Sequence, residues 1–221
     1  MIKGIAALSM LVDHLCLIVV AFFPYAEDLS LPVLWYSILT SIGRLAFPLF
    51  CFAAVEGFLH TGNRIRYVIR IFLCTIVSEP AFDYAFFNVW LEFTQQNVLF
   101  TIVLGIIGIW MCEFIVNRIS EKSKHHILCY SAAVLPLLAL AYIAQLFNTD
   151  YSALGVLTIG LMYVLRKQRI FACLADSAVL ALDVSAAPLQ FFGFFSVLPV
   201  FFYSGKKGSG LISISSIPLI C

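Results

Sequence analysis

Long apolar runs dominate the sequence, and several of them reach the width of a lipid bilayer. A transmembrane helix needs about 20 apolar residues, because its backbone polar groups must be satisfied inside the helix where water is absent. The runs predicted to span the membrane are residues 3–23, 33–59, 66–87, 97–117, 126–147, 152–166, 170–185 and 188–204. They predict an all-α bundle of about eight transmembrane helices. The sixth and seventh runs are short, so we expect one of them to be re-entrant or little tilted.

The composition excludes a soluble protein. Hydrophobic residues make up 62% of the chain and charged residues only 11%, whereas a soluble domain carries about 25% charged residues. The formal net charge of +1 gives no indication of nucleic-acid binding, so membrane lipids are the expected surroundings. The seven cysteines form no CxxC pair, and we expect neither a metal site nor disulfides.

The charged residues outside these runs divide between two sets of loops. With eight spans and a cytoplasmic N-terminus, every Lys and Arg except Arg44 falls at the cytoplasmic side of the membrane. The acids of the opposite loops are Glu27, Asp28, Glu92 and Asp150. Because the positive-inside rule predicts such segregation, we expect a multi-pass protein of the bacterial inner membrane with both termini in the cytoplasm.

Ionisable residues also occur inside the predicted spans, where each costs about 2.5–3.5 kcal/mol on insertion scales. They are Asp13, His14, Arg44, Glu56, Glu79, Asp83 and Asp176. An ion pair of Arg44 with Asp13 or Glu56 would account for one acid and would leave His14 unexplained. Helices in lipid can pack through Gly, Ala and Ser alone, so we expect these side chains to face the bundle interior or a water-filled cavity.

Local features place several of these residues. Pro48 removes a backbone hydrogen bond and predicts a kink just after Arg44. Glu79 and Asp83 are four residues apart and therefore share a helix face. Asn97 begins the fourth run, where it either caps the helix or joins the polar cluster.

Basic and polar residues gather at the cytoplasmic end of the second run. They are His60, Asn63, Arg64, Arg66 and Arg70. Such a cluster suits an anionic ligand, but it serves equally well as a topology signal that contacts lipid headgroups.

Several segments resemble the TraX family. They are MLVDHL, GRLAFPLFCFAAVEGFLHTGN, RYVIRIFLCTIVSEPAFD, QQNVLFTIVLG and YSGKKG. The family is named for the conjugation protein that acetylates the N-terminus of F pilin, and many members have no assigned substrate. The resemblance implies one multi-helix inner-membrane domain over residues 1–208 and a pilin, peptide or glycan as the acceptor.

A more distant likeness connects the chain with membrane acyltransferases of the acyltransferase-3 type. Their first-helix signature of Arg, Ala, Val and His at fixed spacing resembles the series Lys3, Ala6, Met10 and His14. Their second signature, rich in Phe and ending in Gly-Phe-Leu, resembles FPLFCFAAVEGFL. Both likenesses imply transfer of an acetyl or other acyl group from cytoplasmic acyl-CoA to an amine or hydroxyl.

Such a reaction gives the polar residues roles. His14 would act as general base or as nucleophile, and Arg44 would stabilise the developing oxyanion. Asp13 would orient the His14 ring or balance Arg44. The supporting polar residues would be Glu56, Glu79, Asp83 and Asn97. The CoA phosphates would be held by His60, Asn63, Arg64, Arg66, Lys206 and Lys207.

The tail departs from the family pattern. Members close with a helix that reads roughly FYxFYPxHL, whereas this chain ends in ISISSIPLIC, which is too short to span a bilayer. A coding sequence that fits this ending reads FYFFYPSHL when it is translated two bases later. We therefore expect a frameshift near residues 206–211, with residues 209–221 as an atypical tail in place of a ninth family helix.

Two other functions are compatible with the same residues. A proton-coupled transporter would also place acids and a histidine at membrane depth, although the sequence shows no internal repeat. A non-catalytic scaffold of a conjugation or envelope apparatus would tolerate joint replacement of Asp13, His14 and Arg44 by residues the size of Leu.

Overall fold

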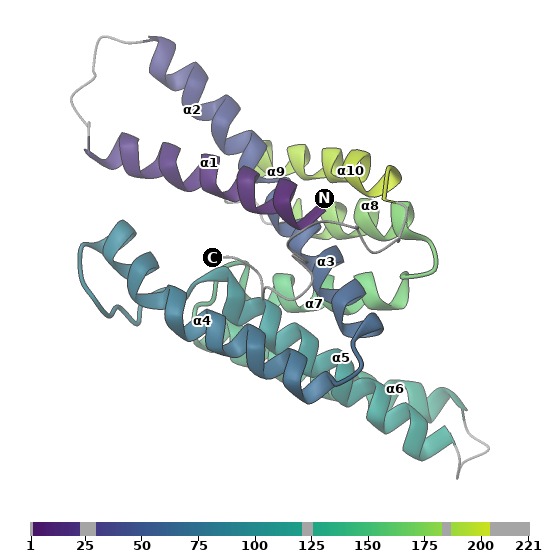
Figure 1. Cartoon of the computed structure of the whole chain (residues 1–221). Coiled ribbons are helices and arrows are strands. Elements are labelled where there is room, and N and C mark those ends of the chain that lie inside the picture. The colour runs from purple at the N-terminus through teal and green to yellow at the C-terminus, as the bar shows by residue number, and fades with distance from the viewer. Residues whose placement is uncertain (1, 23–29, 121–125, 183–186, 204–221) are drawn as a thin grey trace. The chain divides into compact units, whose positions relative to one another are not determined.

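The computed structural model describes residues 2–22, 30–120, 126–182 and 187–203. These residues are helical almost throughout (Figure 1), which confirms the predicted all-α class. The elements are α1 (Ile2–Phe22), α2 (Ser30–Gly43), α3 (Ala46–His60), α4 (Arg64–Phe87), α5 (Val98–Ser120), α6 (His126–Leu146), α7 (Ser152–Val164), α8 (Arg169–Leu180), α9 (Ala187–Gln190), the 3₁₀ helix η1 (Phe191–Ser196) and α10 (Val197–Phe201). Within this described part, the one β-type pairing is an isolated bridge between Gln96 and Thr149.

The chain forms two compact units, which are described separately. Unit 1 combines Met1–Ala53 with Leu165–Cys221, and unit 2 is Ala54–Val164. Helix α3 begins in the first unit and ends in the second.

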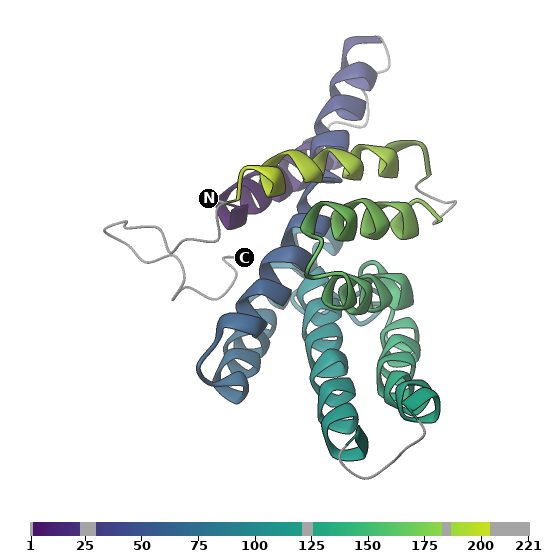
Figure 2. The ribbon, with the colours of Figure 1, turned by 90° about the vertical axis from the view of Figure 1, so that its right-hand side faces the viewer.

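In unit 1, two pairs of neighbouring segments form the packing. Helices α1 and α2 pack against each other, and α8 packs against η1 and α10. Figures 1 and 2 show α8 lying beside the α9–η1–α10 segment. Contacts of α1 with α10, and of α2 with α9 and η1, join the two pairs.

The predicted second span is broken where the sequence analysis expects a kink. Helix α2 ends at Gly43 and α3 begins at Ala46. Pro48 has no N–H to donate to the carbonyl of Arg44, so the helical hydrogen-bond ladder is interrupted there. The Leu45 N–H instead bonds to the Ile42 carbonyl at 3.2 Å, one residue short of the α-helical spacing. Arg44 therefore lies between α2 and α3, where the helix is interrupted.

The predicted eighth span is wrong as a single continuous helix. The chain there forms the short helix α9, then η1, then α10. At Gly193, in η1, an added Cβ would lie 3.5 Å from the Arg44 carbonyl oxygen and 3.5 Å from the Ser177 Oγ. The 3₁₀ segment therefore brings its backbone to the helix break and to α8 at one point.

Unit 2 is organised around α5. This helix packs against α4, α6 and α7, and α6 also packs against α7. Glycines allow the close approach, since an added Cβ at Gly105 would lie 2.4 Å from the Ile159 Cδ1, and one at Gly160 would lie 2.3 Å from the Leu137 Cδ2. Small residues at helix crossings are typical of helices that associate in lipid.

Three described stretches are long and apolar enough to cross a membrane. They are Ile2–Val19, Trp35–His60 and Val98–Arg118. The shorter apolar helices are Val134–Leu146, Ser152–Val164 and Phe191–Phe201. Large apolar side chains such as Val77 and Leu135, 77% and 61% exposed, lie on the helix surfaces, as expected where lipid replaces water. These features support a membrane protein, while the eight-span count and the orientation stay predictions.

Candidate functional site

The structure brings Asp13 of α1 to the end of α2 in unit 1. An added Cβ at Gly43 would lie 2.4 Å from both the Cβ and the Cγ of Asp13, so the carboxyl group packs directly on the Gly43 backbone. The next residue, Arg44, interacts electrostatically with that carboxyl group. The Asp13 Oδ1 atom is buried and accepts no hydrogen bond from the described residues. Of the two partners that the sequence left open for Arg44, Asp13 therefore lies close enough for the two charges to interact.

Unit 1 also buries other polar residues on α1, α2, α8 and η1. Cys16 lies one turn further along α1, close enough for its thiol to feel the Asp13 charge, and Thr40 of α2 is 1% exposed. Ser177 of α8 and Ser196 of η1 are fully buried. Sequence reasoning missed both serines, because a lone serine in an apolar run is also the ordinary residue of a helix crossing.

His14 follows Asp13 on α1 and is partly buried. Successive residues of an α-helix point about 100° apart, so its ring and the Asp13 carboxyl group leave the helix in different directions. That His14 faces the bundle interior or a water-filled cavity stays a prediction.

A second cluster lies in unit 2, where α4 approaches the start of α5. The Glu79 Oε2 atom accepts hydrogen bonds from the Asn97 backbone N–H at 3.3 Å and from the Asn97 side-chain amide. The same amide donates to the Ser78 Oγ at 3.1 Å. The Asn97 Oδ1 atom accepts the Leu99 N–H at 2.9 Å, which confirms that Asn97 caps α5. Asn97 therefore fulfils both roles that the sequence left open, as a cap and as a member of the polar cluster.

Asp83, one turn beyond Glu79, is hydrogen-bonded to the loop between α4 and α5. It is fully buried, and its Oδ2 atom accepts the Glu92 N–H at 2.8 Å. The Glu92 side chain accepts the N–H groups of Phe93 and Thr94 at 2.9 and 3.1 Å. These two hydrogen bonds, with that of Phe93 the larger cause, lower the pKa of Glu92 below its ordinary value of 4.5.

A second loop pairs with this one, and sequence reasoning did not foresee it. The Gln96 N–H donates to the Asn148 carbonyl at 3.2 Å, and the Asp150 N–H donates to the Gln96 carbonyl at 2.9 Å. Beneath them, the buried Thr101 hydroxyl donates to the Thr149 hydroxyl at 2.9 Å. The acid cluster of unit 2 is therefore embedded in a loop assembly whose hydrogen bonds serve the backbone.

The predicted anion-binding residues of unit 2 have partners of their own. The Arg64 Nη2 atom lies 2.9 Å from the Glu113 Oε1 atom, and the Asn63 side chain caps α4 by accepting the Arg66 N–H at 2.9 Å. These contacts favour structural roles for Arg64 and Asn63, and anion binding there stays a prediction.

Two further predicted site residues of unit 2 lie close together. The His60 Nδ1 atom is 3.5 Å from the Glu56 Oε2 atom and 2.9 Å from the Glu56 carbonyl oxygen. Glu56 therefore lies beside His60 in this unit. Lys206 and Lys207 lie outside the described residues.

Comparisons with known proteins identify the family. No solved structure matches the chain. The chain is 28% identical to the "Probable fimbrial assembly protein FimC, serogroup H1" of Dichelobacter nodosus, over 94% of this chain and 84% of that protein. The profile of the TraX protein family matches residues 1–204 and so runs through both units. The chain therefore belongs to the TraX protein family.

Proposed function

We propose that the protein is an integral inner-membrane acyltransferase that moves an acetyl group from cytoplasmic acetyl-CoA to an acceptor amine or hydroxyl. The observation that carries the proposal is the Asp13 carboxyl group, which packs on Gly43 where α2 ends and interacts electrostatically with Arg44, while His14 is the next residue of α1. Charged groups at membrane depth are costly and are functional by default. Membership of the TraX family supports acyl transfer, and the fimbrial name of the Dichelobacter relative supports a pilin as acceptor.

In this proposal His14 takes a proton from the acceptor amine while the amine nitrogen attacks the thioester carbonyl carbon. The C–S bond then breaks, and the CoA thiolate leaves and takes the proton from His14. Alternatively, His14 attacks the thioester carbonyl carbon first, the C–S bond breaks, and the CoA thiolate leaves with the acetyl group held on the ring. The amine then displaces the ring, and its proton passes to the His14 nitrogen that is released. The second route would leave label on the protein and the first would not.

Arg44 supplies the positive charge that such a step requires. The guanidinium group presents fixed donors to the oxygen that becomes negative in the tetrahedral intermediate, and this effect is strong where water is excluded. The packing of Asp13 on Gly43, next to Arg44, supports the role in which Asp13 balances and positions the arginine.

The test uses purified full-length protein in lipid nanodiscs, radiolabelled acetyl-CoA and a peptide with a free N-terminus. Wild type is compared with His14→Ala and with Leu15→Ala. Leu15 is the matched control, because it neighbours His14 but is 52% exposed on the outer face of α1. General acid–base catalysis contributes about 10²–10⁴-fold, so acetylation should fall at least a hundredfold in His14→Ala and persist in Leu15→Ala. Full activity of His14→Ala would refute the assignment.

A non-catalytic role in a fimbrial or conjugation apparatus is the second candidate. The name of the Dichelobacter relative favours it, because an assembly protein need not be an enzyme. A scaffold predicts that joint replacement of Asp13, His14 and Arg44 by Leu-sized residues preserves pilus assembly in cells. An acyltransferase predicts that the same replacement abolishes acetylation of the pilin.

A further inference from the structure

Unit 1 carries an open groove of about 490 Å³ where α8 begins and α10 ends. Its lining includes Lys167, Gln168, Arg169, Phe171, Phe201 and Tyr203, and the other residues that line it are apolar. Two of the lining residues are cationic and none is acidic.

The first turn of α8 adds to the positive character of the groove. Gln168 occupies the N-cap position, with φ −118° and ψ 72°, but makes no side-chain hydrogen bond to the helix. The first N–H groups of a helix have no partner within the helix, and the helix dipole favours an anion near them. Lys167 and Arg169 flank this helix start. The helix end and two cationic side chains therefore converge on one concave surface.

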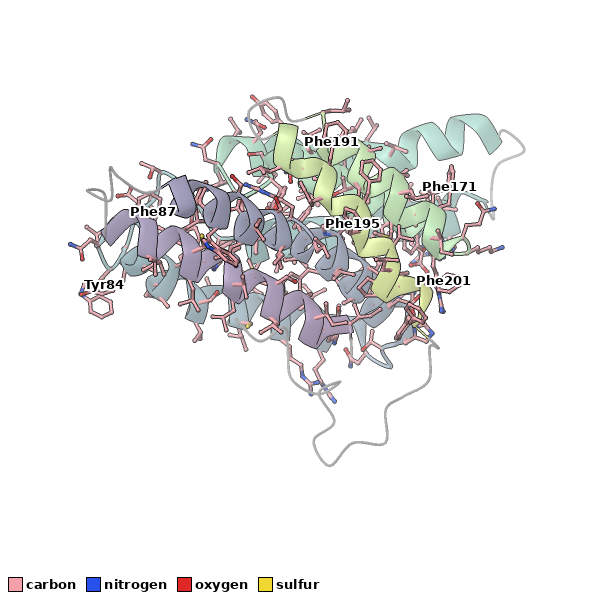
Figure 3. All side chains as sticks on the ribbon, turned by 90° about the horizontal axis from the view of Figure 1, so that it is seen from above. Tyr84, Phe87, Phe171, Phe191, Phe195 and Phe201 are labelled. Carbon is pink, nitrogen blue, oxygen red and sulfur yellow. The ribbon has the colours of Figure 1, made fainter. Side chains whose placement is uncertain are left out.

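Aromatic residues form the other wall of the groove. The Arg169 guanidinium carbon lies 5.3 Å from the centre of the Tyr203 ring. The Tyr203 ring in turn meets Phe52 edge to face, with ring centres 5.5 Å apart. Figure 3 shows Phe171 and Phe201 on α8 and α10, the two helices that line the groove. These contacts fix the position of Arg169 and place exposed aromatic faces beside it.

We propose that this groove binds the phosphate-bearing nucleotide half of the acyl-CoA donor. The inference rests on the proposed function, since it names where the donor is held. Lys167, Arg169 and the start of α8 would contact the phosphate oxygens, to which guanidinium groups bind in bidentate fashion. The aromatic wall would stack against the adenine ring. The positive-inside pattern puts this end of α8 at the cytoplasmic side, where CoA is available.

The phosphate of an anionic lipid headgroup has the same chemistry as the phosphates of CoA. The test therefore distinguishes a groove that binds CoA from one that binds a lipid headgroup. CoA binding is measured on the full-length protein in nanodiscs of neutral phosphatidylcholine, without acetyl donor or acceptor. The variants are Arg169→Gln, Lys167→Gln and Arg166→Gln. Arg166 is the matched control, because it loses the same charge three residues away and does not line the groove.

We expect Arg169→Gln to weaken CoA binding roughly tenfold or more, since a charged hydrogen bond contributes about 1.5–3 kcal/mol. Lys167→Gln should weaken it too, and Arg166→Gln should leave it within about twofold. The exposed position of Lys167 makes it the variant that keeps the test valid if Arg169→Gln fails to fold. Unchanged CoA affinity in both groove variants would overturn the inference.

Native mass spectrometry of the phosphatidylglycerol that stays bound to each variant tests whether the groove holds a lipid headgroup instead of CoA. Loss of the lipid in Arg169→Gln together with unchanged CoA affinity would assign the groove to a headgroup and overturn the inference. CoA binding that depends on Arg169 without any acetyl transfer would support the groove and refute the proposed reaction. Acetyl transfer with CoA affinity insensitive to both variants would refute the groove alone.

Discussion

Asn97 links the buried acid of unit 2 to the start of α5, and its removal gives the sharpest stability prediction. Its side chain donates to the Glu79 Oε2 and to the Ser78 Oγ, and accepts the Leu99 N–H at 2.9 Å. Glu79 is only 7% exposed. In Asn97→Ala, this carboxyl group would keep only the backbone N–H of residue 97, at 3.3 Å, as a donor among the described residues.

Two contributions set the loss of unfolding free energy that we expect for Asn97→Ala. A buried acceptor that loses its hydrogen-bond donor costs about 1–3 kcal/mol, and a helix N-cap contributes about 1 kcal/mol. The longer contact of the same amide with the Ser78 Oγ uses one of its two hydrogens and adds nothing further to this sum. We expect Asn97→Ala to lower the free energy of unfolding by about 2–4 kcal/mol.

The assay is reversible unfolding of the full-length protein in detergent, with Asn63→Ala as the matched control. Asn63 caps α4 through the Arg66 N–H at 2.9 Å but contacts no buried acid. The control should therefore lose only about 1 kcal/mol. A double-mutant cycle with Glu79→Gln should give a coupling energy above about 1 kcal/mol. Equal losses in the two Asn→Ala variants, or additivity with Glu79→Gln, would refute the reasoning.

Two further predictions, one for unit 1 and one for unit 2, use the same unfolding assay. Gly43→Ala would place a methyl group 2.4 Å from the Asp13 Cβ, so we expect a loss of about 1–3 kcal/mol, whereas Gly4→Ala meets nothing within 4 Å and should be neutral or slightly stabilising. Equal effects of the two would refute the close contact. The Arg64–Glu113 pair is 2.9 Å apart but 37% and 22% exposed, so its double-mutant coupling should stay below about 1 kcal/mol, and a larger value would show a desolvated pair.

The positions of the helices follow closely from the sequence, because a bilayer fixes how long an apolar run must be. The run predicted at 66–87 forms Arg64–Phe87, and the run at 97–117 forms Val98–Ser120. The break at Arg44 was also predictable, since Pro48 lacks the N–H that a continuous helix needs.

The broken eighth span was not predictable in this way. Residues Phe191–Ser196 are almost wholly apolar, and hydropathy is the same for a 3₁₀ helix and an α-helix. The difference lies in the packing of Gly193 against Arg44 and Ser177, which are contacts between residues far apart in the chain. A pattern read along the sequence contains no information about such contacts.

The same reason limits the prediction of the site. The sequence offered Asp13 and Glu56 as partners of Arg44, and the electrostatic interaction with Asp13 depends on the packing of α1 against α2. The groove of unit 1 was missed because Arg169 begins α8 whereas Tyr203 follows the end of α10, more than thirty residues further along the chain. Single ionisable residues could be identified, but their pairing depends on the tertiary structure.

The hydrogen bonds that a buried polar side chain accepts from backbone N–H groups distinguish a structural role from a chemical one. Asp83 accepts the Glu92 N–H, and Asn97 accepts the Leu99 N–H. These side chains complete hydrogen bonding that the loop and the helix start leave open, so the fold alone explains them. Asp13 differs because the described residues give it no backbone N–H donor, and its carboxyl group packs on Gly43 beside Arg44. Helix packing does not require charged groups at this place. Replacing buried charges of opposite sign by apolar residues of similar volume is often neutral or stabilising, so stability alone does not explain why they are present. The Asp13–Arg44 pair, with His14 beside it, is therefore where chemistry is to be sought first, and Glu79, Asp83 and Asn97 are where loss of the fold is to be expected.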